Sequence, residues 1–130
     1  MGVGNFFGML PESMKSSRLY GVELDSITGR IAKQLYPKAD ITVAGFETTD
    51  RKDFFDLAVG NVPFGQYQVS DRAFDKLGFS IHNYFFAKAL EQVRPGGVVA
   101  FVTCLINNST NNFSTFCCYG RRHQNQECCQ

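Results

Sequence analysis

Apolar and polar residues alternate along the chain in short blocks that are typical of strands and helices in turn. Four blocks predict strands, at residues 18–23, 41–44, 55–60 and 98–103. The second and third of these are apolar almost throughout, as in strands that a parallel sheet buries on both faces. Because helical patterns separate the strands, the sequence predicts an α/β fold with a mostly parallel sheet.

Three helices are expected between these strands. The first is a short helix at residues 5–14, and the second follows a cap at Asp25 or Ser26 and stops before Pro37. Its apolar residues recur at four-residue spacing on one face: Ile27, Ile31 and Leu35.

The third helix is predicted to begin after a cap at Ser80 and to end at the Pro95-Gly96-Gly97 sequence. Its apolar stripe comprises Tyr84, Phe85, Ala89, Leu90 and Val93. The polar stretch 66–78 before it predicts a loop, in which Tyr67, Asp71, Arg72 and Lys76 are interpreted as solvated charges and rings rather than as substrate contacts. His82 has no carboxylate or serine at a suggestive spacing, so a satisfied or exposed histidine is expected rather than a catalytic base.

The composition changes sharply at Asn107. From there on the chain holds no Ala, Val, Ile, Leu or Met, so we predict a structured domain at 1–106 and a low-complexity, disordered or aberrant tail at 107–130. The tail carries two adjacent cysteine pairs and His123, but adjacent pairs lack the usual spacing of zinc ligands, and no metal site is predicted.

Length and charge limit the function further. A chain of 130 residues with 13 basic and 12 acidic side chains is the size of one globular domain. No apolar run is long enough to span a membrane and no signal peptide opens the chain, so a cytoplasmic location without membrane contact is expected. The net charge of +1 indicates that strong DNA binding would need other regions.

Candidate chemistry lies just beyond the predicted strands, because ligands of such sheets bind at the carboxyl ends. A glycine-rich turn, Gly2-Val3-Gly4, leads into the first helix and would let the backbone approach a ligand closely. Glu23 ends the next strand, where a carboxylate can accept hydrogen bonds from the two hydroxyls of a ribose. Together these features favour a nucleoside-containing ligand.

The sequence Asn61-Val62-Pro63-Phe64-Gly65 follows the strand at 55–60. The Asn61 side-chain oxygen and the carbonyl beside Pro63 can accept hydrogen bonds from an exocyclic amino group, whose lone pair is otherwise delocalised into its ring. Proline stiffens this turn, and Phe64 can stack on a base.

These three motifs, in this order, resemble those of the S-adenosylmethionine-dependent adenine-specific DNA methyltransferases. More narrowly they resemble the bacterial methylase domains of type I restriction-modification subunits and of helicase-associated proteins, over residues 2–104. The resemblance implies a Rossmann-like class I methyltransferase fold that acts on an adenine flipped out of DNA. It implies catalytic roles for Asn61, Pro63 and Phe64, with Val62 in place of the commoner proline. It also implies a cofactor site that comprises Gly2, Gly4, Asn5, Glu23, Asp25, Phe46 and Glu47.

The chain departs from that family at both ends. In the family a strand precedes the glycine turn and lies centrally in the sheet order 3-2-1-4-5, whereas this chain opens inside the turn. We therefore expect a truncated domain that is unstable or inactive without its N-terminal and target-recognition regions. Other readings are methylation of a protein glutamine or an RNA base, and a noncatalytic remnant. An NAD-dependent oxidoreductase also has a glycine turn and an acid, but it gives no reason for residues 61–64.

Overall fold

The computed structural model describes residues 1–62, 70–72, 80–105, 113–121 and 126–129. The chain forms two compact units, Met1–Thr49 and Asp50–Gln130, which are described in turn. We call them unit 1 and unit 2.

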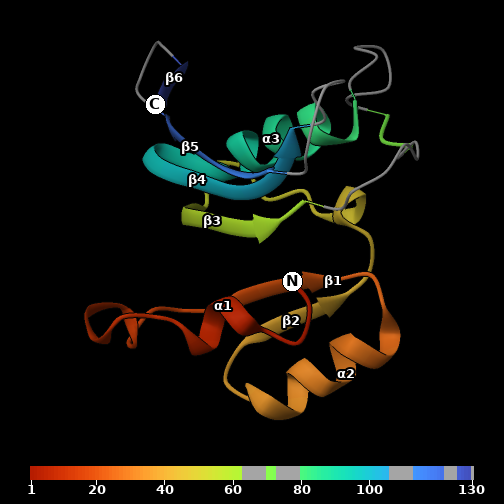
Figure 1. Ribbon diagram of the computed structural model, residues 1–130. Coiled ribbons are helices and arrows are strands. Elements are labelled where there is room, and N and C mark those ends of the chain that lie inside the picture. Colours follow the sequence, from red (N-terminus) through yellow and green to blue (C-terminus); the bar gives the residue numbers. More distant parts are fainter. Residues whose placement is uncertain (63–69, 73–79, 106–112, 122–125, 130) are drawn as a thin grey trace. The chain divides into compact units, whose positions relative to one another are not determined.

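Unit 1 is built on a pair of parallel strands joined by a helix (Figure 1). Strand β1 (Tyr20–Glu23) pairs with β2 (Asp40–Val43), in a register that sets Tyr20 opposite Asp40 and Glu23 opposite Val43. Because the strands are parallel, their carboxyl ends lie at the same edge. The predicted strand–helix–strand order is confirmed for this part of the chain.

Helix α2 (Ser26–Leu35) begins and ends as its sequence predicts. The Asp25 side chain caps it by accepting a hydrogen bond from the Thr28 N–H at 2.7 Å, and the helix ends shortly before Pro37. Its buried residues are small, namely Gly29 and Ala32. A Cβ atom on Gly29 would lie 2.7 Å from Cγ2 of Val43, so the glycine allows the helix to lie close to β2.

The predicted apolar face of α2 is present but exposed. Ile27, Ile31 and Leu35 do share one side of the helix, but they are 61%, 45% and 59% exposed. The small residues approach the two-stranded sheet instead, because a short sheet meets only one side of the helix. Four-residue spacing identifies an apolar face, but it does not say whether another element covers it.

The predicted helix at 5–14 is also corrected. The structure has a single helical turn, α1 (Asn5–Gly8), and a separate 3₁₀ turn, η1 (Glu12–Met14). Pro11 lies between them as the extended cap of η1, and a proline disfavours helical backbone in the residue before it. A second 3₁₀ turn, η2 (Phe46–Thr48), follows β2.

Unit 2 contains a four-stranded sheet in the order β3-β4-β5-β6. Strand β3 (Phe55–Asn61) is parallel to β4 (Val93–Leu105), and α3 (Ile81–Gln92) connects them in the chain. The Ser80 side chain caps α3 by accepting a hydrogen bond from the Asn83 N–H at 3.3 Å, as predicted. The predicted apolar stripe is buried at most of its positions, including Tyr84, Ala89, Leu90 and Val93.

Strand β4 begins earlier than its sequence predicts. Val93 already pairs with Phe55, and Val98 pairs with Leu57, so the Pro95-Gly96-Gly97 sequence forms an irregularity within β4 rather than a loop before it. Gly96 has a left-handed φ of 85°, which suits glycine.

Two further strands lie in the segment for which the sequence predicts disorder. Strand β5 (Phe113–Arg121) runs antiparallel to β4, and β6 (Gln126–Cys129) runs antiparallel to β5. The physical reason is that backbone pairing depends little on apolar composition. Thr, Phe and Tyr residues in 113–121 also favour strands.

Among the described residues, both edges of the β1–β2 pair lack a strand partner, whereas the β3–β4 pair lacks one only beside β3. Carbonyls of Leu19 and Glu23 point to β2, so the Val22 carbonyl points to the opposite edge of β1. The α-amino group of Met1 donates to that carbonyl at 3.1 Å. Met1 therefore lies beside β1, on the side away from β2.

Candidate active site

The carboxyl ends of β1 and β2 bring several predicted cofactor residues to one edge of unit 1. Glu23 ends β1, and its carbonyl accepts a hydrogen bond from the Ala44 N–H at 3.0 Å. Phe46 and Glu47 begin η2 just after β2. Gly2 reaches the same edge, because its N–H donates to the Glu23 carboxylate at 2.6 Å.

The two glycines of the turn have left-handed backbones but different surroundings. Their φ angles are 63° at Gly2 and 94° at Gly4, where other residues would be strained. A Cβ atom at Gly4 would lie 2.6 Å from the Tyr36 ring, whereas a Cβ atom at Gly2 would meet nothing within 4 Å. Gly4 thus allows α1 to pack on the end of α2, and Gly2 leaves open space beside Glu23. Asn5, the first residue of α1, is exposed.

Glu23 is held by donors on both carboxylate oxygens. Its Oε2 accepts hydrogen bonds from the Met1 amino group at 2.9 Å and from the Gly2 N–H, and its Oε1 accepts from the Asp25 N–H at 3.0 Å. Partial burial raises the pKa of Glu23, but the hydrogen bonds from the amino group and the two N–H groups outweigh it, so the pKa lies below its ordinary value. Glu23 is therefore an ionised acceptor with a fixed orientation.

Asp25 has a structural partner in the cap of α2. The hydrogen bonds from Thr28 hold the pKa of this carboxyl below its ordinary value. Asp25 is exposed and lies two residues after Glu23. Its role in cofactor binding stays a prediction.

In unit 2, Asn61 is the last residue of β3, although the sequence places it just after the strand. It pairs with Val102 of β4 and its side chain is exposed. The next residue, Val62, is only 1% exposed, and its N–H donates to the Val102 carbonyl at 3.0 Å. The backbone around Asn61 is thus fixed to β4 while its amide faces outward. Pro63 and Phe64 lie outside the described residues, as do Tyr67 and Lys76.

The interpretation of Asp71 as a solvated charge is wrong. Its carboxylate pairs with Lys88 of α3 at 2.6 Å and accepts a hydrogen bond from the Tyr84 hydroxyl at 2.8 Å. The side chains of Lys88 and Asp71 are 7% and 9% exposed. We call these three residues the Asp71 cluster. Its sequence signal is a lysine four residues after Tyr84 on the apolar face of a helix, which needs a buried counter-charge.

The imidazole of His82 differs from both expected states. It lies on α3, where its Nε2 is buried and has no hydrogen-bond partner in the part of the chain that the structure describes.

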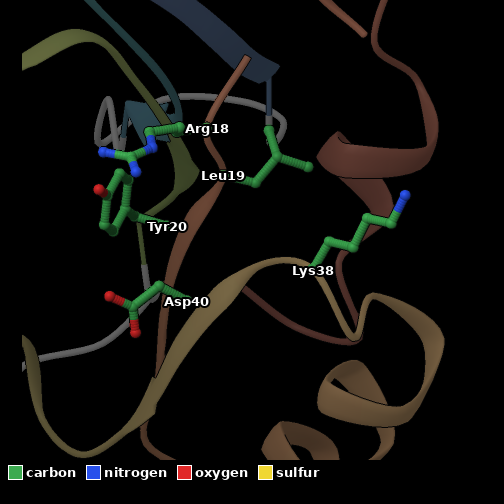
Figure 2. Close-up of a pocket in the computed structure, with 5 residues that line it drawn as sticks. All are labelled: Arg18, Leu19, Tyr20, Lys38 and Asp40. Carbon is green, nitrogen blue, oxygen red and sulfur yellow. The ribbon is translucent and has the colours of Figure 1, made fainter. Parts of the chain in front are cut away.

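A surface hollow lies at the opposite end of β1 and β2. Figure 2 shows its lining: Arg18, Leu19, Tyr20, Lys38 and Asp40. Tyr20 and Asp40 begin the two strands, whereas Glu23 ends β1. The hollow is therefore separate from the predicted cofactor edge.

The described residues contain neither a group of metal ligands nor a membrane-spanning helix. Within the ranges given above, no three His, Cys, Asp or Glu side chains are grouped so that they could hold a metal ion. No helix within these ranges is long and apolar enough to cross a membrane.

Comparison with known proteins finds partial relatives. No family pattern matches the chain. It is 33% identical over 86 residues to the defense against restriction protein B of Escherichia phage P1, a match that covers 62% of this chain and 4% of that protein. It is 36% identical over 63 residues to the type II methyltransferase M.CvrRI of Paramecium bursaria Chlorella virus XZ-6E, covering 48% of this chain and 16% of that one. The chain thus spans a small part of either relative.

Solved structures show the fold. The PH0226 protein of Pyrococcus horikoshii OT3 superposes with a TM-score of 0.59 at 15% identity, over 79% of this chain and 45% of that one. The [4+2]-cyclase SpnF superposes with a TM-score of 0.53 at 13% identity, over 83% and 38%. The chain has the Rossmann-like methyltransferase fold, as predicted.

Proposed function

We propose that this chain transfers a methyl group from S-adenosylmethionine to the exocyclic amino group of adenine in DNA. The observation that carries the proposal is the placement of Asn61. Its side chain is exposed at the end of β3, and the backbone on either side of it is paired with β4. Parallel sheets present their reactive groups at this end of a strand.

The predicted cofactor edge fits the nucleoside part of S-adenosylmethionine. Glu23 is ionised and oriented, and its Oε1 has one described donor, so it can accept a further hydrogen bond from a ribose hydroxyl. The open space at Gly2 would admit a ligand next to this carboxylate. Other residues assigned to this ligand are Gly4, Asn5, Asp25, Phe46 and Glu47. When bound, S-adenosylmethionine supplies an electrophilic methyl group on a sulfonium.

Asn61 would activate the acceptor. Its side-chain oxygen accepts a hydrogen bond from the adenine amino group, and the carbonyl beside Pro63 accepts a second. Both acceptors offset the positive charge that develops on nitrogen as the nitrogen–carbon bond forms and the carbon–sulfur bond breaks. The amino group then loses a proton, and no bond to the protein is needed.

DNA would present the adenine out of the double helix. Extrusion costs a few kcal/mol, which stacking on Phe64 would partly offset. One relative is named a type II methyltransferase, which supports methyl transfer in general. Target recognition and the remaining N-terminal part of the domain would come from other regions of a longer protein.

A competition among acceptors tests this proposal. Labelled S-adenosylmethionine is incubated with the 130-residue chain, and with the longest natural polypeptide that contains it. The acceptors are duplex DNA, the same duplex with hypoxanthine in place of adenine, RNA of the same sequence, and a glutamine-containing peptide. With the natural polypeptide we expect label only in the adenine duplex, and with the 130-residue chain alone we expect none. Label in RNA or peptide would assign a different acceptor, and label in the hypoxanthine duplex would contradict adenine as the acceptor.

A further inference from the structure

Val62 follows Asn61 in the candidate catalytic motif, and both its side chain and its backbone N–H have contacts within the protein. Its side chain is 1% exposed, which makes it one of the largest fully buried side chains in the described chain. Its N–H also donates to the Val102 carbonyl at 3.0 Å. The neighbouring Asn61, in contrast, is exposed.

We propose that Val62 is a positioning residue, whose backbone N–H and buried side chain fix the Asn61 amide for methyl transfer. The inference rests on the proposed function. A proline at this position, which the motif more commonly has, could not donate the hydrogen bond to Val102. The bond from Val62 is thus one of those that hold Asn61 opposite Val102, the last pair of the β3–β4 ladder.

The geometry explains why this bond matters. Side chains alternate along a strand, so burying Val62 requires Asn61 to face the opposite way. Rotation of the backbone at Asn61 would break the bond to Val102 and expose an apolar side chain. Each contact of Val62 therefore restrains the direction of the Asn61 amide. Reactions that depend on such placement are sensitive to small displacements, and about 1 Å can change a rate by about 10²-fold.

Two substitutions separate the effect of the Val62 N–H from the effect of the Val62 side chain. Val62→Pro removes the donor and keeps an apolar group of similar size. Val62→Ala keeps the donor and leaves a cavity, which lowers stability. The control is Val59→Ala, because Val59 lies in the same strand, is 41% exposed and takes no part in the site.

The variants are made in the natural polypeptide that contains the chain, and kcat, the Kd of S-adenosylmethionine and Tm are measured for each. We expect Val62→Pro to lower kcat by at least about tenfold with cofactor Kd unchanged. Val62→Ala should lower Tm more than kcat, and Val59→Ala should change neither. Full kcat in Val62→Pro would overturn the inference, as would a loss of kcat that simply follows Tm across the two Val62 variants.

Amide hydrogen exchange tests the contact without any activity. The Val62 N–H should exchange as slowly as the amides within β3, and rapid exchange would overturn the inference. Failure of the proposed function can be distinguished from failure of the inference about Val62. A wild-type protein that methylates no acceptor would contradict the proposed function, and the inference with it. Active wild type with fully active Val62→Pro removes only the role of Val62.

Discussion

At the residue scale, the amide of Asn61 carries the proposed chemistry. Its side chain is exposed and its backbone pairing does not depend on the side chain, so Asn61→Ala should leave the fold intact. We expect kcat to fall by roughly 10²–10³-fold, because one transition-state acceptor is lost. Cofactor affinity, measured by calorimetry, should stay unchanged. Asn83→Ala on α3 is the matched control, since Asn83 is also exposed. An active Asn61→Ala would contradict the assigned role.

Glu23 makes the stability of unit 1 depend on pH. Its folded pKa lies below its ordinary value, so the ionised carboxylate stabilises the folded state above the unfolded pKa of about 4.3. That contribution is lost as pH falls through the lower folded pKa. We expect urea denaturation to show a falling free energy of unfolding below about pH 5, and a flatter dependence in Glu23→Gln. Glu12→Gln, at an exposed ion pair, should match the wild type. Equal slopes for Glu23→Gln and wild type would argue against this electrostatic account.

The Asp71 cluster should be costly to break from one side. Lys88→Met leaves a buried carboxylate without its ammonium partner, and such a change typically costs about 3–5 kcal/mol. Lys52→Met removes a lysine whose pairing with Glu91 is exposed, so it should shift Tm little. Chemical denaturation of both variants gives the comparison. Similar losses in the two would show that burial of the Asp71 cluster does not matter.

At the element scale, the irregularity in β4 depends on Gly97. A Cβ atom there would lie 2.8 Å from the Asp56 carbonyl and 3.0 Å from the Arg94 carbonyl, neither of which can rotate away. Gly97→Ala should therefore destabilise unit 2 by roughly 1–3 kcal/mol. In Gly60→Ala the nearest atoms belong to the Phe101 ring at 3.3 Å, which can shift, so the loss should be smaller. Thermal unfolding of the two variants measures these losses. An unchanged Tm in Gly97→Ala would contradict the close approach of the two carbonyls to Gly97.

Sequence patterns predict elements well where the signal is local. The caps Asp25 and Ser80 set the starts of α2 and α3, and both are confirmed. Prediction fails where the outcome depends on a partner elsewhere in the chain. The apolar face of α2 is exposed because the two-stranded sheet meets another side of the helix, and β5 forms because β4 offers it a backbone edge.

The candidate site shows the same difference between local signals and contacts with distant parts of the chain. The sequence predicts that the glycine turn and Glu23 serve the same ligand, and the structure places Gly2 beside Glu23 at the carboxyl end of β1. The burial of Val62 and the pairing of Asp71 with Lys88 depend on contacts across the sheet and onto α3. A local pattern can indicate that Lys88 needs a counter-charge, but it does not identify Asp71 as that partner or predict the burial of Val62.

At the scale of the whole molecule, the two units should differ in stability. The buried apolar side chains of unit 1 are few, Ala32 and Ile41, and one edge of β1 has no strand partner among the described residues. Most of the buried apolar side chains belong to unit 2. We expect amides of β1 and β2 to exchange with solvent faster than those of β3 and β4, because local opening costs less where little surface is buried. Equal protection would contradict this account.

The central claim is that the molecule methylates the amino group of adenine. Its most direct test digests DNA to nucleosides after incubation with isotopically labelled S-adenosylmethionine, and identifies the labelled nucleoside by mass. We expect label in N6-methyl-2′-deoxyadenosine with the wild-type natural polypeptide, and label that accumulates roughly 10²–10³-fold more slowly with Asn61→Ala. Label on another nucleoside, or unlabelled DNA from a folded protein that binds the cofactor, would contradict it.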